Sequence, residues 1–249
     1  MTEEAVDRRR TQLSDDFAAI DLHQMELAGR YTDWLVRQIR PHCGRRILEV
    51  GAGIGTISSR LLRHADYVCA LEPNPACFES LRRRLDGEKS FECRRWRIED
   101  CDLQFIASRR IDTIVCVNVL EHLEDEVQAL ARVRTMLHGP AGRLVLVVPA
   151  VPAAYGSIDA ALGHYRRYSR ASLRSALAQA GFSVESLHYS NLIALLGWMY
   201  NARVSRRIHQ SDAQIRVFDA LIVPWYSRLE RLLPPPIGLS LVAAARRGS

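Results

Sequence analysis

Apolar and polar residues follow two different periods along this chain, and the change of period separates strands from helices. Short apolar runs typical of buried strands lie near residues 46–50, 66–71, 92–97, 112–117 and 143–149. The run GRLVLVVPA is almost wholly apolar, which favours a central parallel strand covered on both faces. Stretches with helical spacing separate these runs. The pattern predicts an α/β protein with a Rossmann-like, doubly wound sheet that binds ligands over the carboxyl ends of its strands.

Two further strands complete the expected sheet. Residues 181–190 and 237–247 have strand patterns, and we expect them to pair antiparallel at one edge. The sheet then has seven strands, six of them parallel and the last antiparallel.

Helical segments flank this core, and we expect them to belong to the same single domain, 1–249. Residues 1–44 predict N-terminal cap helices, ahead of a core formed by 45–190 and 237–249. Residues 191–236 predict a helical insertion before the last strand, rich in aromatic residues. It is expected to be a lid over an apolar substrate, with a plain helical hairpin or a homodimer contact as the alternatives.

The run ILEVGAGIGTIS is the clearest candidate for chemistry. A short strand ends in glycines at alternate positions, Gly51, Gly53 and Gly55, where the backbone can turn sharply without a Cβ. A helix follows, and amides at such a turn suit a nucleotide-bearing ligand. A dinucleotide fingerprint would need a glycine where this chain has Thr56, which disfavours a nicotinamide dehydrogenase. With Glu49 the pattern is ExGxGxG, and it resembles motif I of the class I S-adenosylmethionine (SAM) dependent methyltransferases.

An acidic residue ends the second strand. Glu72 follows Gly55 by 17 positions, where a carboxylate can accept both ribose hydroxyls of a nucleoside. We therefore predict that Glu72 binds the ribose. The resemblance to motif I further implies that Ala52, together with Pro73 beside the ribose acid, contacts the cofactor.

The segment after the fourth strand extends the resemblance. IDTIVCVNVLEHLEDE looks like the "D…NVLEH" segment of small-molecule methyltransferases of the ubiquinone-biosynthesis type, and the likeness covers roughly residues 28–150. It implies that the backbone at Asn118 and Val119 touches the methionine part of the cofactor. It also implies that an aromatic residue at about the position of Tyr31 lies over the methionine carboxylate, with a core tyrosine as the alternative.

The adenine contacts are less clearly marked. Many relatives carry Gly-Asp shortly before this point, where this chain has Trp96-Arg97. The resemblance therefore assigns the adenine amino group to Ile98, Glu99 or Asp100, without choosing among them.

Nucleic acid is not the expected partner. Base-modifying methyltransferases usually carry an Asn/Asp-Pro-Pro-aromatic tetrad after the fourth strand, whereas this chain continues from Asn118 as NVLE. The net charge is +6 and the pI is near 9.2. Nearly all of the positive charge is arginine spread along the chain without interleaved aromatics, so most of it is expected to be solvated surface.

Cysteine usage and hydropathy indicate the compartment. The six cysteines are scattered with no CxxC, which suits a reduced cytosol and argues against disulfides or zinc. The first residues lack the apolar stretch of a secretory signal, and NLIALLGWMY is too short to span a membrane. We predict a cytoplasmic protein without a membrane span.

Methyl transfer requires an aligned nucleophile and, for a hydroxyl acceptor, removal of its proton. His122 follows the fourth strand and is one candidate base. The segment HYRRYSR supplies two others, His164 and Tyr168.

The same segment predicts substrate contacts. Arg166 and Arg167 could clamp a carboxylate or phosphate, with Tyr165 beside them and Trp198 from the insertion. The structural alternative is a salt-bridged loop before a helix capped by Ser169. No metal is expected, because the carboxylates that flank the fourth strand, Asp112 and Asp125, have no evident third ligand.

These observations predict a SAM-dependent methyltransferase that acts on a small molecule and releases S-adenosylhomocysteine. The resemblance implies a role in specialised metabolism. O-methylation is favoured, with N- and C-methylation open. One alternative is C-methylation of an isoprenoid or lipid phosphate. The apolar insertion would contact the hydrocarbon part of such a substrate, and the basic loop would bind its phosphate. The other alternative is a non-catalytic SAM-binding partner subunit.

Overall fold

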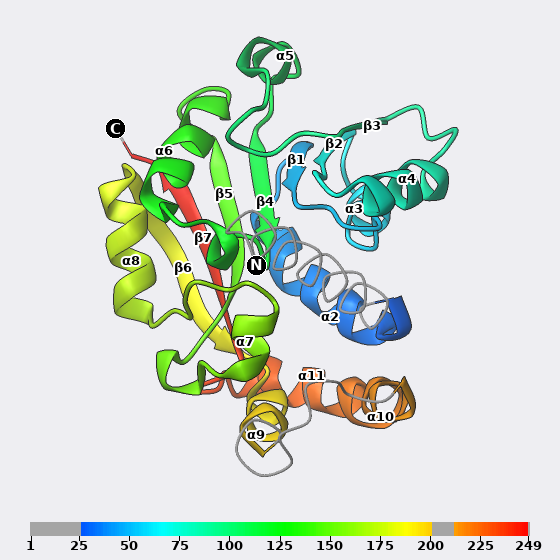
Figure 1. Cartoon of the computed structure of the whole chain (residues 1–249), viewed down its shortest axis with the longest axis vertical. Coiled ribbons are helices and arrows are strands. Elements are labelled where there is room, and N and C mark those ends of the chain that lie inside the picture. Colours follow the sequence, from blue (N-terminus) through cyan, green and yellow to red (C-terminus); the bar gives the residue numbers. More distant parts are fainter. Residues whose placement is uncertain (1–25, 201–211, 249) are drawn as a thin grey trace, which may run out of the picture.

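The computed structural model describes residues 26–200 and 212–248 (Figure 1). Most of the expected cap helices and the middle of the expected insertion lie outside the described residues. None of the described helices is long and apolar enough to cross a membrane.

Seven strands form one sheet in the order β3-β2-β1-β4-β5-β7-β6. Only β7 runs antiparallel to its neighbours, β5 and β6, so the predicted Rossmann-like sheet of six parallel strands and an antiparallel last strand is confirmed. The strands are β1 Arg46–Val50, β2 Tyr67–Leu71, β3 Phe91–Arg94, β4 Thr113–Val117, β5 Arg143–Pro149, β6 Phe182–Ser190 and β7 Ser240–Arg247.

Helices cover both faces of this sheet. In β1, Leu48 and Val50 belong to the core on one face and Ile47 to the core on the other, as the two-residue period of a strand requires. Helices α5, α6 and α8 pack on the first face, and α2 and α3 pack on the second (Figure 1). The helices up to the sixth strand are α2 Gly29–Ile39, α3 Ser58–Leu61, α4 Pro75–Arg84, α5 Leu103–Ser108, α6 Glu126–Met136, α7 Ser157–Ala161 and α8 Arg170–Gln179.

Side-chain caps fix where several of these helices begin. Asn74 accepts from the first amides of α4, and Asp102 and Asp125 do the same for α5 and α6. Ser169 caps α8 as the sequence indicated. The helix predicted after the glycines, α3, begins only at Ser58, because the chain makes turns up to Ile57.

The insertion before β7 is helical in its described part. It contains α9 Leu192–Tyr200, α10 Asp212–Val217, a π-helical turn Phe218–Ile222 and α11 Val223–Leu232. The side chain of Asp219 accepts hydrogen bonds from the amides of Arg30 (3.1 Å) and Tyr31 (2.7 Å) at the start of α2. Trp34 of α2 packs edge-on against Tyr226 of α11, with ring centroids 5.9 Å apart. The insertion is therefore anchored on α2.

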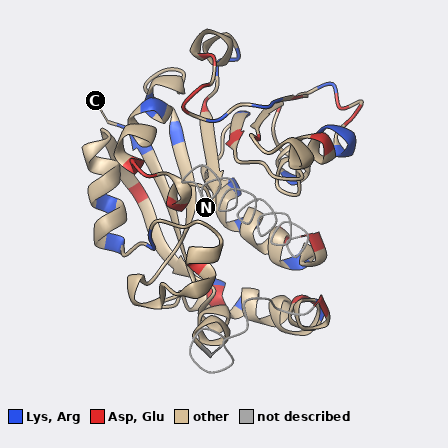
Figure 2. Ribbon diagram, viewed as in Figure 1, with Lys and Arg blue, Asp and Glu red and all other residues tan. Residues whose placement is uncertain are grey.

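Charged side chains are distributed over many helices and strands (Figure 2). Exposed arginine–carboxylate pairs include Arg45 with Asp66, in the loops before β1 and β2, and Arg82 with Glu79 on α4.

Candidate functional site

The turn after β1 is held in a conformation that favours glycine. Gly51, Gly53 and Gly55 have φ values of 70°, 56° and 82°. The amides of Gly51 and Ala52 both donate to the carbonyl of Leu71, at 2.8 and 3.1 Å. The turn therefore lies against the carboxyl end of β2.

Glu72 lies beside this turn, as its spacing predicted. Its side chain is buried, with Oε2 accepting from the amide of Gly53 (2.7 Å) and Oε1 from the amide of Asn74 (2.8 Å). Burial raises the pKa of Glu72, while the two amides favour the ionised form. The carboxylate is thus fixed where the strand ends. Pro73 is exposed next to it.

Glu49 points into the protein. It is buried, and its carboxylate accepts a hydrogen bond from the hydroxyl of Ser58 in α3. Burial raises the pKa of Glu49 to about 8. This carboxyl group ties β1 to α3, and its contact with a cofactor stays a prediction.

The turn after β4 meets the glycine turn. Asn118 has φ 51°, and its amide donates to the carbonyl of Val147 in β5 at 2.9 Å. Val119 packs so closely on Gly51 that a Cβ there would lie 2.5 Å from Val119 Cγ2. The two sequence segments with family resemblance therefore lie together at the carboxyl edge of the sheet.

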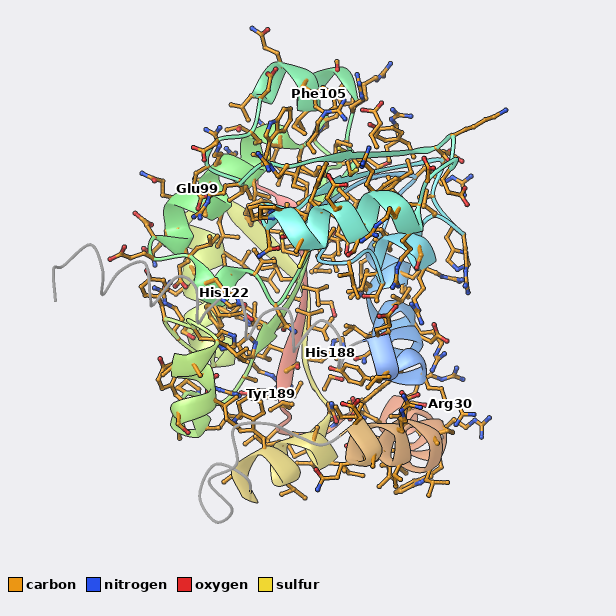
Figure 3. All side chains as sticks on the ribbon, turned by 45° about the vertical axis from the view of Figure 1, so that its right-hand side comes forward. Arg30, Glu99, Phe105, His122, His188 and Tyr189 are labelled. Atoms are coloured by element: carbon orange, nitrogen blue, oxygen red, sulfur yellow. The ribbon has the colours of Figure 1, made fainter. Side chains whose placement is uncertain are left out.

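The residues predicted near adenine follow β3. Ile98 is buried and, with Val50, Val119 and Leu123, lines a small apolar hollow. The carbonyl of Ile98 accepts from Arg132 of α6 at 2.8 Å. Glu99, labelled in Figure 3, is exposed. Asp100 is exposed as well.

Tyr31 packs in the contact between the N-terminal helix and the insertion. Its ring lies edge-on to Trp34, with centroids 5.8 Å apart. This is the core position given as the alternative, and a cofactor contact from Tyr31 stays a prediction.

The segment HYRRYSR is a loop pinned to the sheet and to the turn after β4. Tyr168 is buried, its amide donates to the carbonyl of Pro149 (2.8 Å), and its hydroxyl donates to Glu126 of α6. The amide of Tyr165 donates to the carbonyl of Glu121 at 2.8 Å. Burial and the neighbouring carboxylate raise the pKa of Tyr168, so its hydroxyl is held as a structural donor.

The arginines of this loop are bound within the protein. Arg166 donates to the carbonyl of Leu123 and to Glu126, at 3.0 and 2.7 Å. Arg167 is buried and donates to Asp159 (2.7 Å) and to the carbonyl of Ala150 (3.1 Å). These bonds match the salt-bridged loop that was the alternative to an anion clamp. Tyr165 is exposed, and substrate contact by this loop stays a prediction.

His164 shares Asp159 with Arg167. Its Nδ1 lies 3.0 Å from Asp159 Oδ1, the oxygen that Arg167 also binds. Burial by itself would raise the pKa of Asp159, but the hydrogen bonds and charges of His164 and Arg167 hold this pKa below its usual value. An ionised carboxylate only accepts, so His164 carries its proton on Nδ1 and directs Nε2 the other way.

Nε2 of His164 faces two residues of the turn after β4. Nε2 of His164 is 4.0 Å from Oε1 of the fully buried Glu121. The ring of His122 stands perpendicular to that of His164, with centroids 4.7 Å apart, and Figure 3 marks its place. Desolvation by the surrounding protein and the nearby His164 lower the pKa of His122 to about 4, although its side chain is exposed on one side. Glu121, His122 and His164 each offer a ligand atom, and these atoms lie within 4.8 Å of one another.

Trp198 joins the insertion to this cluster. The guanidinium of Arg167 lies 4.5 Å from the centre of its ring. The indole N–H is buried and has no hydrogen-bond partner within the described part of the chain.

The sequence did not single out Asp159, Glu121 or Glu126. The available signal for Asp159 was an acidic residue five positions before His164. Asp112 and Asp125, the carboxylates that flank the fourth strand, have partners in the fold: Asp112 accepts from the amides of Arg45 and Arg46, and Asp125 caps α6.

Residues 48–144 match the family model described as a methyltransferase domain. This match identifies a methyltransferase domain within the chain. The matched range of this methyltransferase domain runs from β1 into β5, so it contains the glycine turn, Glu72 and Asn118. The loop that holds His164 lies beyond it.

Similar proteins agree with this assignment. The chain is 31% identical to an uncharacterized protein of Mycobacterium tuberculosis over 107 residues, 42% of this chain and 36% of that protein. It is 28% identical to the ubiquinone biosynthesis O-methyltransferase of Xanthomonas euvesicatoria over 178 residues, 66% of this chain and 72% of that enzyme. The match thus spans only about a third of the mycobacterial protein.

A solved structure shows the same fold. The 1,6-didemethyltoxoflavin-N1-methyltransferase of Burkholderia thailandensis, with 1,6-didemethyltoxoflavin and S-adenosylhomocysteine bound, aligns with a TM-score of 0.61 at 17% identity. The alignment covers 100% of this chain and 91% of that one.

Proposed function

We propose that this chain is an enzyme that transfers the methyl group of SAM to a small-molecule acceptor, with a hydroxyl oxygen as the favoured target. The observation that carries this proposal is the convergence of the glycine turn, Glu72 and the Asn118–Val119 turn at one edge of the sheet. The Xanthomonas relative, named as an O-methyltransferase, supports the choice of oxygen.

Each group of this edge has a role toward SAM. Glu72 accepts hydrogen bonds from the ribose hydroxyls, which replace or join those from the amides of Gly53 and Asn74. The bare backbone of the glycine turn allows the cofactor to approach closely, and Asn118 and Val119 contact its methionine part. Ile98 provides an apolar surface for the adenine.

The acceptor then lies beside the turn after β4. The rings of His122 and His164 contact each other in this region. Their nitrogen atoms can form hydrogen bonds with a hydroxyl group of the acceptor. The buried indole N–H of Trp198 is a further donor that an acceptor could satisfy. Because the sulfonium already activates the methyl group, alignment at this point supplies much of the rate increase.

The test uses methyl-labelled SAM with the purified protein and an extract of source cells, divided into polar and lipid fractions. Label in a polar compound supports the proposal and gives a mass with which to identify the acceptor. Binding of S-adenosylhomocysteine without label in either fraction would contradict it and would favour a non-catalytic SAM-binding subunit.

A membrane-borne acceptor is the second candidate, and the surface of α10 and α11 favours it. Large apolar side chains are exposed in a row at helical spacing. They are Val217, Leu221, Trp225, Leu229 and Leu232, and Leu232 keeps 74% of its surface exposed.

The charges of this face suit an anionic bilayer. Arg216, Arg228 and Arg231 are exposed on α10 and α11, whereas Asp219 and Glu230 are buried. Asp212, at the start of α10, is the exposed acidic residue of the two helices. A second copy of the chain would bring arginines against arginines, whereas acidic lipid headgroups would pair with them.

Vesicle sedimentation distinguishes this candidate. Vesicles with about a third phosphatidylglycerol should retain the protein, and vesicles of phosphatidylcholine alone should retain less. The double change Trp225→Ser and Leu232→Ser should release it, while Leu103→Ser, at an exposed leucine of α5, should not. Equal release by both variants, or no retention of the unchanged protein, would remove the membrane candidate.

A further inference from the structure

We propose that Glu121, His122 and His164 bind a divalent transition-metal ion, of the kind represented by Zn²⁺, next to the place assigned to the methyl acceptor. Two imidazoles and one carboxylate form a ligand set that such ions prefer. The sequence led us to expect no metal, because the third ligand comes from a loop 42 residues further along the chain than His122.

The separations suit a metal centre. Ligand atoms bonded to tetrahedral Zn²⁺ at ~2.05 Å are about 3.4 Å apart. Nε2 of His164 and Oε1 of Glu121 are 4.0 Å apart, and no pair in the three-residue set exceeds 4.8 Å. Small side-chain rotations would bring the atoms to bonding distance.

Asp159 prepares His164 for this role. Metal-binding histidines generally donate their second N–H to a carboxylate, which fixes the ring and raises its basicity. Asp159 occupies that position at 3.0 Å from Nδ1, so the lone pair on Nε2 of His164 points toward Glu121. Arg167 balances the charge of Asp159.

The backbone holds the two halves of the set together. The amide of Tyr165 donates to the carbonyl of Glu121, joining the loop directly to the turn that carries the other two ligands. The amide of His164 donates to the carbonyl of Asp159 at 2.9 Å. The arrangement therefore exists before any ion binds, which lowers the cost of binding.

Three protein ligands leave coordination positions open, as in catalytic rather than structural sites. A hydroxyl of the acceptor could occupy such a position and lose its proton more readily there. This use of the ion rests on the proposed methyl transfer, whereas binding of the ion does not.

The experiment titrates the metal-stripped full-length protein with Co²⁺, read by visible absorption, and with Zn²⁺, read by calorimetry. We expect about one ion per chain and at least roughly tenfold weaker binding in His122→Asn, since one of three ligands is lost. His122 keeps part of its surface exposed, so this variant should fold. Asp159→Asn should weaken binding about 10- to 100-fold through His164.

The matched control is His188→Asn. His188 lies on β6, half-buried, with Gln38 as its neighbour at 3.3 Å (Figure 3). This variant should bind both ions like the unchanged protein. Absence of Co²⁺ and Zn²⁺ binding, or equal binding by His122→Asn and the unchanged protein, would overturn the proposal.

S-adenosylhomocysteine binding, measured on the same samples, separates this inference from the proposed function. Cofactor binding without metal binding would refute the metal site alone. Metal binding without cofactor binding would refute the methyltransferase proposal and leave the metal site standing.

Discussion

The amide of Gly53 donates a hydrogen bond of 2.7 Å to the carboxylate of Glu72, across 19 residues of sequence. This bond joins the turn after β1 to the end of β2 and places a buried carboxylate where a ribose would lie. The proposed cofactor site depends on this relationship.

Gly51 should not tolerate a side chain. Gly51→Ala adds a Cβ at φ 70° and 2.5 Å from Val119 Cγ2, so both strain and overlap oppose it. We expect a loss of about 2–4 kcal/mol in the free energy of unfolding, measured by urea denaturation.

Gly197→Ala in α9 is the matched control, because a Cβ there meets no atom within 4 Å. It should leave stability unchanged or slightly higher. Equal effects of the two variants would show that the Gly51 turn is not as tight as described.

The buried pair of Asp159 and Arg167 should matter for stability. Asp159→Asn leaves Arg167, with 1% of its side chain exposed, without its carboxylate. Thermal or urea unfolding should show a loss of about 3 kcal/mol.

The exposed pair of Arg45 and Asp66 provides the comparison. Its side chains keep 66% and 56% of their surface exposed, so Asp66→Asn should change stability little. If Asp159→Asn were equally mild, Asp159 would not be the anchor of the His164 loop.

Glu49 should make stability depend on pH. Its pKa is raised to about 8 in the folded chain, from 4.5 in the unfolded one, so the folded state holds the proton more tightly. The resulting stability is present below the unfolded value and is lost as pH rises through the folded one. As the pH rises from 4.5 to about 8, the melting temperature of the unchanged protein should therefore fall by more than that of Glu49→Gln.

Glu79→Gln, at an exposed glutamate of α4, should keep the slope of the unchanged protein. Parallel curves for all three proteins would mean that Glu49 is ionised in the folded state.

The sequence predicted the sheet because its signals are local. The apolar runs of β1, β2, β4 and β5 and the glycines at 51–55 specify strands and a turn without knowledge of the rest of the chain. β3 was predicted too long, since Trp96 leaves the sheet to pack on Phe105 of α5.

Side-chain partners were harder to predict, because they come from distant segments. For Arg166 and Arg167 the sequence left open a substrate clamp or a salt-bridged loop, because their carboxylate partners, Glu126 and Asp159, lie 40 and 8 residues away. His164 was identified as a candidate, but its closeness to Glu121 follows from the bond between the two segments' backbones.

The most direct test of the account is calorimetric binding of S-adenosylhomocysteine to the unchanged protein and to Glu72→Ala, with Glu79→Gln as control. Loss of two charge-assisted hydrogen bonds to ribose should weaken binding by at least roughly tenfold, about 1.4 kcal/mol, in Glu72→Ala alone. Equal affinity in all three proteins, or no binding to the unchanged protein, would contradict the cofactor site on which the proposed function rests.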